Sequence, residues 1–169
     1  MLTTSTLRRW LRALPTRRRA SAPPHGGAAG HLPPQRQPGR AREYRGSVEL
    51  AYSPRHDGEP DPGEVVWTWV PFEEDNGEGK DRPVVVIGRA TSASPGDLAV
   101  LMLSSKPHPD DPRWLELGTG DWDPEGRASS VRLDRVLVVA RDAVRREGAA
   151  LERERFDRVG AALTNLHGW

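Results

Sequence analysis

Apolar residues gather in five short runs between residues 61 and 140, and turn-forming residues separate the runs. The runs are rich in β-branched and aromatic residues, which is typical of β-strands. The predicted strands are residues 64–70, 82–89, 98–105, 113–117 and 129–139. The run "PVVVIG" has no polar break, which predicts that the second strand is buried on both faces.

The C-terminal end follows a different, helical pattern. Its apolar residues recur at spacings of three and four with charged residues between them: Leu151, Phe156, Val159, Leu163 and Leu166. This predicts an amphipathic helix over about 152–166, closed by Gly168. No Ser, Thr, Asn or Asp stands near 149–151 to cap its start. Five short strands and one helix predict a mainly β (α+β) fold, a small and strongly curved antiparallel sheet or barrel.

Residues 1–60 have a different composition, dense in Pro, Gly and Arg. Their apolar surface is too small to offset the entropy of ordering, which predicts a disordered tail over 1–60 and a folded domain over 61–169. Within the tail, Leu7, Trp10, Leu11 and Leu14 have helical spacing with arginines between them. Two interpretations stay open: a short basic amphipathic helix that contacts nucleic acid, lipid or an acidic partner, or an arginine-rich tail with accidental spacing. A start codon further downstream is a third possibility.

Charge divides the chain in the same place. The net charge of +1 combines +8 over residues 1–58 with −7 over residues 59–169. The chain has no cysteine, which excludes disulfides and thiolate chemistry and fits a reducing compartment. No apolar run is long enough for a membrane-spanning helix or for the core of a secretory signal. We therefore expect a cytoplasmic protein without a membrane contact.

Four motifs in order give the folded part a family resemblance. They are "PGEVVWTWVPF", a loop ending in "GKDRPVVVIG", "LAVLMLSSK" and "SVRLDRVLVV", followed by the closing helix. Together, over about 61–167, they resemble the PemK/MazF family of toxins of toxin–antitoxin systems.

The resemblance implies an SH3-like barrel and a homodimer that cleaves single-stranded RNA without a metal or other cofactor. It also implies a cognate antitoxin that occupies the RNA groove. The family's catalytic Arg falls on Arg82 and its catalytic Thr on Ser104, while Gly63, Trp67 and Pro83 match positions that look structural. Asp134 matches the acidic residue of the fifth strand, and Arg135 stands where many members have Gln. The acidic body and the long tail depart from the family pattern.

The physical properties of Arg82 suit this role. Pro83 keeps the preceding residue out of the helical region, so Arg82 is extended at the mouth of a strand. A guanidinium meets two phosphoryl oxygens at once and keeps its charge. The alternative is a structural ion pair with Asp81 or with an acid of the preceding loop.

Further candidates for RNA binding follow strand 98–105. Ser104 and Ser105 offer hydroxyls and Lys106 a charge, although ordinary turn chemistry explains them equally well. His108, between two prolines, is a candidate for proton transfer, or a solvated loop residue. Trp122 lies in a predicted turn and is a candidate for base stacking, or a core residue.

Trp69 and Trp114 are open to the same two readings, with the core favoured. Two groups of acids, Glu73 to Asp75 and Asp110 with Asp111, suggest solvated loops rather than acid–base catalysis.

We therefore expect a toxin that acts as a ribosome-independent endoribonuclease, leaving a 2′,3′-cyclic phosphate and a 5′-hydroxyl. The alternative is a non-catalytic module that binds nucleic acid or protein, which the acidic body favours because phosphate neutralisation dominates nucleic-acid affinity. A third reading is a member that binds DNA together with its antitoxin as a co-repressor.

Overall fold

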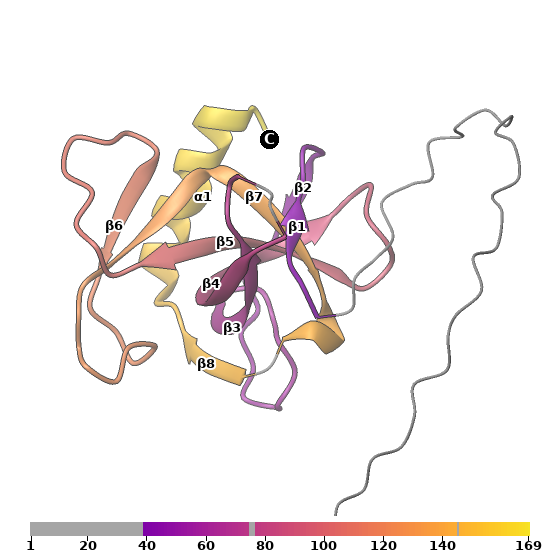
Figure 1. Cartoon of the computed structure of the whole chain (residues 1–169), viewed down its shortest axis with the longest axis horizontal. Coiled ribbons are helices and arrows are strands. Elements are labelled where there is room, and N and C mark those ends of the chain that lie inside the picture. The colour runs from indigo at the N-terminus through magenta and orange to yellow at the C-terminus, as the bar shows by residue number, and fades with distance from the viewer. Residues whose placement is uncertain (1–38, 75–76, 145) are drawn as a thin grey trace, which may run out of the picture. The chain divides into compact units, whose positions relative to one another are not determined.

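The structure is a computed structural model that describes residues 39–74, 77–144 and 146–169 (Figure 1). The possible helix over Leu7–Leu14 and most of the predicted tail lie outside the described residues. The elements are β1 (Arg42–Glu43), β2 (Val48–Leu50), β3 (Glu64–Pro71), β4 (Gly79–Ala90), β5 (Asp97–Ser104), β6 (Trp114–Gly118), β7 (Ser129–Ala140), a 3-10 turn (Arg141–Ala143), β8 (Arg146–Ala150) and α1 (Arg153–His167). All five predicted strands and the predicted helix are confirmed.

The described strands form one antiparallel sheet with the order β1-β7-β5-β4-β3-β8. β2 adds to β4, and β6 adds to β7. The sheet curls into a half-barrel, and α1 packs beside β7 (Figure 1). The predicted fold class, a curved antiparallel sheet with one C-terminal helix, is therefore confirmed. No helix in the described part of the chain is long and apolar enough to cross a membrane.

β4 separates two apolar clusters. Val85 and Ile87 belong to the cluster that also contains Phe156, Val159 and Leu163 of the helix. Val84 and Val86 belong to the second cluster, on the other face of the strand. These four residues of β4, Val84–Ile87, are fully buried, as the unbroken apolar run predicts.

The prediction of disorder is wrong for residues 39–60. β1 pairs with β7 and β2 pairs with β4, and Val48 is only 6% exposed. Tyr52 packs on Phe156 with the ring centroids 5.1 Å apart, and its hydroxyl donates to the Leu151 carbonyl at 2.9 Å. Its ring also fills the space that Gly63, at a φ of 99°, leaves open. Composition alone underestimated the order of this segment. A few apolar residues are enough to order a segment that adds to an existing sheet.

β8 is the second element that the sequence analysis missed. It pairs with β3 at the edge of the sheet. Its sequence, "REGAA", carries no alternation of apolar and polar residues. Backbone pairing to a neighbouring strand, rather than a side-chain pattern, therefore defines this strand.

Three arginines outside β3 and β4 contact the end of β3 and the loop that follows it. Arg135 donates to the Pro71 carbonyl at 2.9 Å, and Arg40 lies over the Trp69 ring at 4.2 Å. Arg132 of β7 pairs with Glu73 in the loop and with Asp134, whose Oδ1 lies 2.8 Å from its Nε. These contacts fix the course of the chain into the first residues of β4.

We expect Tyr52→Ala to lower the free energy of unfolding by about 2–3 kcal/mol, because it opens a cavity beside Phe156 and removes one hydrogen bond. Tyr52→Phe removes only the hydrogen bond and should cost about 1 kcal/mol. Denaturant unfolding measures both values, with the exposed Glu49→Gln as a control. A Tyr52→Ala protein as stable as the control would show that residues 39–60 do not support the core.

The Arg132 cluster predicts a loss of stability in acid. Hydrogen bonding and the charge of Arg132 lower the pKa of Glu73, and the same contacts outweigh burial to lower the pKa of Asp134. A carboxyl with a lowered folded pKa stabilises the fold above its unfolded pKa and loses that effect as pH falls through the folded value. The melting temperature should therefore fall below about pH 4.5 in the parent more steeply than in Arg132→Met. Parallel curves for the two proteins would contradict this assignment.

Candidate functional site

A cavity of about 640 Å³ opens where β4 begins and β5 ends, facing the loop that connects β6 to β7. Its lining residues come from four places in the sequence: Trp67; Lys80–Pro83; Leu103–Lys106; and Asp121–Glu125 with Arg127 and Ser129. Five of the six predicted site residues therefore meet at one cavity: Arg82, Ser104, Ser105, Lys106 and Trp122.

Arg82 is the fourth residue of β4 and is paired in register with Thr68 of β3. It is half-buried, and its guanidinium makes no side-chain hydrogen bond or ion pair to any residue that the structure describes. Burial lowers the pKa of Arg82, and the positive charge of Arg135 lowers it further. An arginine remains charged under such shifts, so the cavity holds a cation available to an anion.

Ser104 lies at the end of β5 and is 9% exposed. Its Oγ accepts a hydrogen bond from the Lys106 backbone N–H at 3.2 Å. Because that contact uses the oxygen as acceptor, the hydroxyl hydrogen remains able to donate into the cavity. Ser105 and the exposed Lys106 line the same side.

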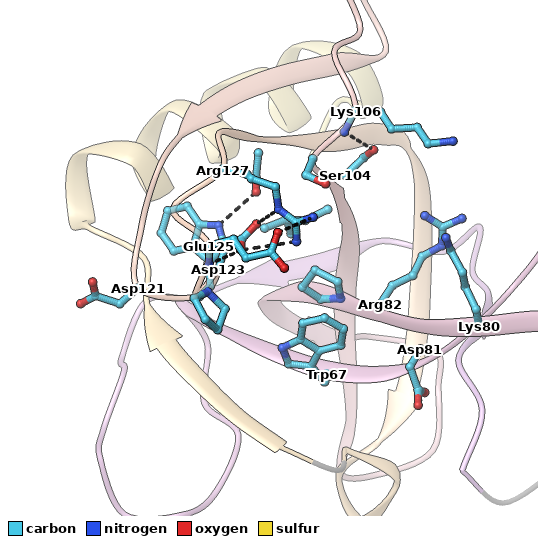
Figure 2. Close-up of a pocket in the computed structure, with 16 residues that line it drawn as sticks. Trp67, Lys80, Asp81, Arg82, Ser104, Lys106, Asp121, Asp123, Glu125 and Arg127 are labelled. Atoms are coloured by element: carbon cyan, nitrogen blue, oxygen red, sulfur yellow. Dashed lines mark hydrogen bonds and ion pairs between the residues drawn. The ribbon is translucent and has the colours of Figure 1, made fainter.

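Trp67 forms the floor of the cavity together with Pro83, its partner in the β3–β4 pairing. Figure 2 shows the indole between Arg82 and the residues of the β6–β7 loop. The sequence analysis assigned Trp67 and Pro83 to structure only. The position of Trp67 could have indicated its place at the cavity. Trp67 pairs with Pro83, the residue next to Arg82, so Trp67 and Arg82 lie at the same end of the strands.

An ion-paired group forms the wall opposite Arg82 (Figure 2). Arg127 pairs with Asp123 at 2.8 Å and with Glu125 at 3.1 Å. The hydrogen bond from Arg127 lowers the pKa of Asp123. Four cations and four acids line the cavity in total, and the acids Asp81 and Asp121 point away from it in Figure 2. The free cations therefore concentrate on the side of Arg82.

Trp122 lies in the core rather than on the surface. It is 5% exposed, and its Nε1 donates to the Ser129 Oγ at 3.2 Å. Trp122 lines the cavity but is buried, which favours the core interpretation over base stacking. The packing of loop residues against α1, including Arg155 over this ring at 5.7 Å, accounts for its burial.

His108 lies apart from the cavity lining. Its ring stacks on Trp114 with centroids 3.7 Å apart and planes 3° from parallel. Pro107 and Pro109 restrain the loop on either side of it. The structure thus gives no support to His108 as a partner of Arg82.

Two of the loop acids form ion pairs. Glu73 contacts Arg132, and Asp111 receives two hydrogen bonds from the Arg113 side chain, at 2.9 and 2.7 Å, which lower its pKa to about 2. Within the described ranges, no group of three or more His, Cys, Asp or Glu is placed to hold a metal ion.

Together these residues suit a ligand that carries both an anionic group and a flat ring. A guanidinium, a hydroxyl and an ammonium line one cavity, and these are groups that can bind a phosphoryl group. A flat aromatic surface lies beside them and can take up a nucleobase.

The fold is similar to that of several solved structures, including the following three. An endoribonuclease in complex with its cognate antitoxin from a mycobacterial species has 17% identity and a TM-score of 0.48, with 64% of this chain and 95% of that chain covered. An endoribonuclease from a mycobacterial species has 15% identity and a TM-score of 0.45, with coverages of 68% and 96%. MazE-MazF from Deinococcus radiodurans has 20% identity and a TM-score of 0.49, with coverages of 66% and 98%. No curated protein matches the chain significantly.

The comparison with protein-family models shows the family to which the sequence belongs. The model of the PemK-like, MazF-like toxin of type II toxin–antitoxin systems matches residues 61–167, more than half of the chain. The match includes β3 to α1 and every residue that lines the cavity. It confirms the resemblance that the four sequence motifs indicate, and the chain therefore belongs to the PemK/MazF family of toxins.

Proposed function

We propose that this toxin is an endoribonuclease that cleaves single-stranded RNA in the cavity lined by Arg82 and Ser104. The observation that carries the proposal is the guanidinium of Arg82, half-buried beside the cavity and without a side-chain partner among the described residues. A half-buried cation that no carboxylate of the described residues neutralises, at the mouth of a buried strand, suits a bound phosphate better than it suits the fold.

The proposed reaction is an internal transesterification that needs no metal ion. The ribose 2′-oxygen attacks the adjacent phosphorus and gives up its proton, and the bond from phosphorus to the 5′-oxygen breaks as that oxygen takes up a proton. The products are a 2′,3′-cyclic phosphate and a 5′-hydroxyl. Arg82 stabilises the charge that develops on the nonbridging oxygens, and Ser104 donates to one of them.

The shape of the cavity favours single-stranded RNA as the substrate. Attack in line with the leaving oxygen requires a nucleotide that is free to rotate, and stacking on Trp67 requires a base that is not paired. Aromatic surfaces are a common means of holding unpaired bases. Lys80 and Lys106 add charge along the side of the cavity that the RNA backbone would follow.

The second candidate function is a binding module without efficient chemistry. The observation in its favour is electrostatic: acids equal cations in the cavity lining, and residues 59–169 carry a net charge of −7. Both features reduce the attraction of the surface for nucleic acid. RNA that binds to the parent protein without being cut would favour this function.

The proposed partners follow from the family. We propose a homodimer in the cytoplasm and a cognate antitoxin whose acidic side chains pair with Arg82, Lys80 and Lys106 and so exclude RNA. Binding of DNA would come through the antitoxin complex. Co-expression with the neighbouring reading frame, followed by co-purification, tests the antitoxin.

We expect Arg82→Ala to reduce RNA cleavage by about 10²- to 10³-fold, the usual loss for one donor to a developing oxyanion. Arg82→Lys should fail nearly as badly, because an ammonium lacks the two-pronged guanidinium. The melting temperature of both variants should stay close to that of the parent. A large drop in melting temperature would make Arg82 structural, and cleavage at the parent rate would place the chemistry elsewhere.

Trp67 offers a separate test of base stacking. Trp67→Ala should weaken binding of an RNA with a 2′-deoxy nucleotide at the cleavage site by about 1–3 kcal/mol, whereas Trp67→Phe should retain most of the affinity. Fluorescence anisotropy of a labelled oligonucleotide measures both. Equal affinity of all three proteins would remove Trp67 from the binding surface.

A further inference from the structure

We propose that Glu43, which precedes the segment matched by the family model, positions the catalytic Arg82 by way of Arg135. The inference rests on the proposed function, since it concerns the placement of the residue that would bind the phosphate. The family match begins at residue 61, whereas Glu43 lies in β1 beside β7 (Figure 1).

Arg135 is fixed on three sides. It is 7% exposed, its Nε donates to Glu43 Oε1 at 2.5 Å, and its Nη2 donates to the Pro71 carbonyl at 2.9 Å. Its Nη1 lies 3.7 Å from the sulfur of Met102. Every nitrogen of the guanidinium therefore has a contact, and Glu43 is the carboxylate among them.

Arg82 and Arg135 lie on the same face of the sheet. Met102, which Arg135 contacts, is the register partner of Val84, and both belong to the second apolar cluster. Side chains alternate along a strand, so Arg82 projects to the same side as Val84. The lowering of the pKa of Arg82 by the charge of Arg135 agrees with this placement.

This arrangement gives each arginine a different task. Like charges repel, so Arg135, which cannot turn, directs the guanidinium of Arg82 toward the cavity. The carboxylate of Glu43 keeps Arg135 in place when an anion enters. Without that carboxylate, Arg135 keeps only its contacts to the Pro71 carbonyl and the Met102 sulfur, so the point from which it repels Arg82 is no longer fixed.

The position of Glu43 is itself well defined. β1 pairs with β7 in a register that sets Glu43 opposite Leu137, and the neighbouring Arg42 pairs with the buried Asp97 at 2.7 Å. The N-terminal segment thus supplies a carboxylate at a fixed point beside the site, from outside the family match.

The test is Glu43→Gln, with Glu49→Gln as the matched control. Both changes remove one negative charge from the N-terminal segment, but Glu49 is exposed on β2. We expect Glu43→Gln to lower kcat about tenfold to a hundredfold, as misplacement of a reacting group does. Affinity for RNA with a 2′-deoxy nucleotide at the cleavage site should stay equal or increase, because the site gains positive charge. Glu49→Gln should match the parent in both.

A charge exchange separates positioning from stability. The double variant Glu43→Arg with Arg135→Glu restores an ion pair but sets a carboxylate beside Arg82. Its melting temperature should recover relative to Arg135→Glu alone, while kcat should remain low. Recovery of kcat together with the melting temperature would overturn the inference, because the pair would then be only structural.

The outcomes distinguish the two proposals. If the parent cleaves RNA and Glu43→Gln has the same kcat as Glu49→Gln, the positioning role is wrong and the proposed function stands. If the parent binds RNA and does not cleave it, the proposed function fails and this inference fails with it.

Discussion

Burial of the Val84–Ile87 run on both faces is the constraint on which the rest of the structure depends. Because apolar clusters cover β4 on both sides, the middle of the sheet has no room for a polar side chain without a partner. Polar functional side chains can therefore lie only where the strand leaves the core. Arg82 occupies that point, two residues before Val84, and the end of β5 brings Ser104 to the same place.

The arginines around the site differ in the groups they contact more than in how exposed they are. Arg132 and Arg135 are both buried, yet each is enclosed by carboxylates or carbonyls and holds the β3–β4 loop. Arg127 neutralises the acids of the opposite wall. Arg82 is half-buried without such a partner in the described part of the chain. A half-buried cation of this kind is costly to the fold, which is why we assign it to a ligand.

The sequence predicted the strands, the helix and the residues around the cavity because each depends on local signals. The unbroken apolar run of β4 could only be a buried strand, and Pro83 fixed the extended backbone at Arg82. Residues 39–60 and β8 were missed because their order comes from pairing with strands far away in the sequence. For Trp122 and His108 the sequence left two interpretations open, for a related reason. Whether an aromatic ring in a loop faces solvent or packs on a neighbour depends on tertiary contacts that no local pattern records.

The pairing of β1 with β7 also has a consequence for the order of folding. Glu43 and Arg135 are 92 positions apart in the chain, so their contact cannot form until β7 has left the ribosome. Contacts between distant segments form slowly, because a long loop must close before any interaction repays its entropy. The surroundings of Arg82 are therefore among the last parts of the domain to be completed during synthesis. A nascent chain that has made only β3, β4 and β5 already carries Arg82 and Ser104, but not the groups that hold the arginine in place.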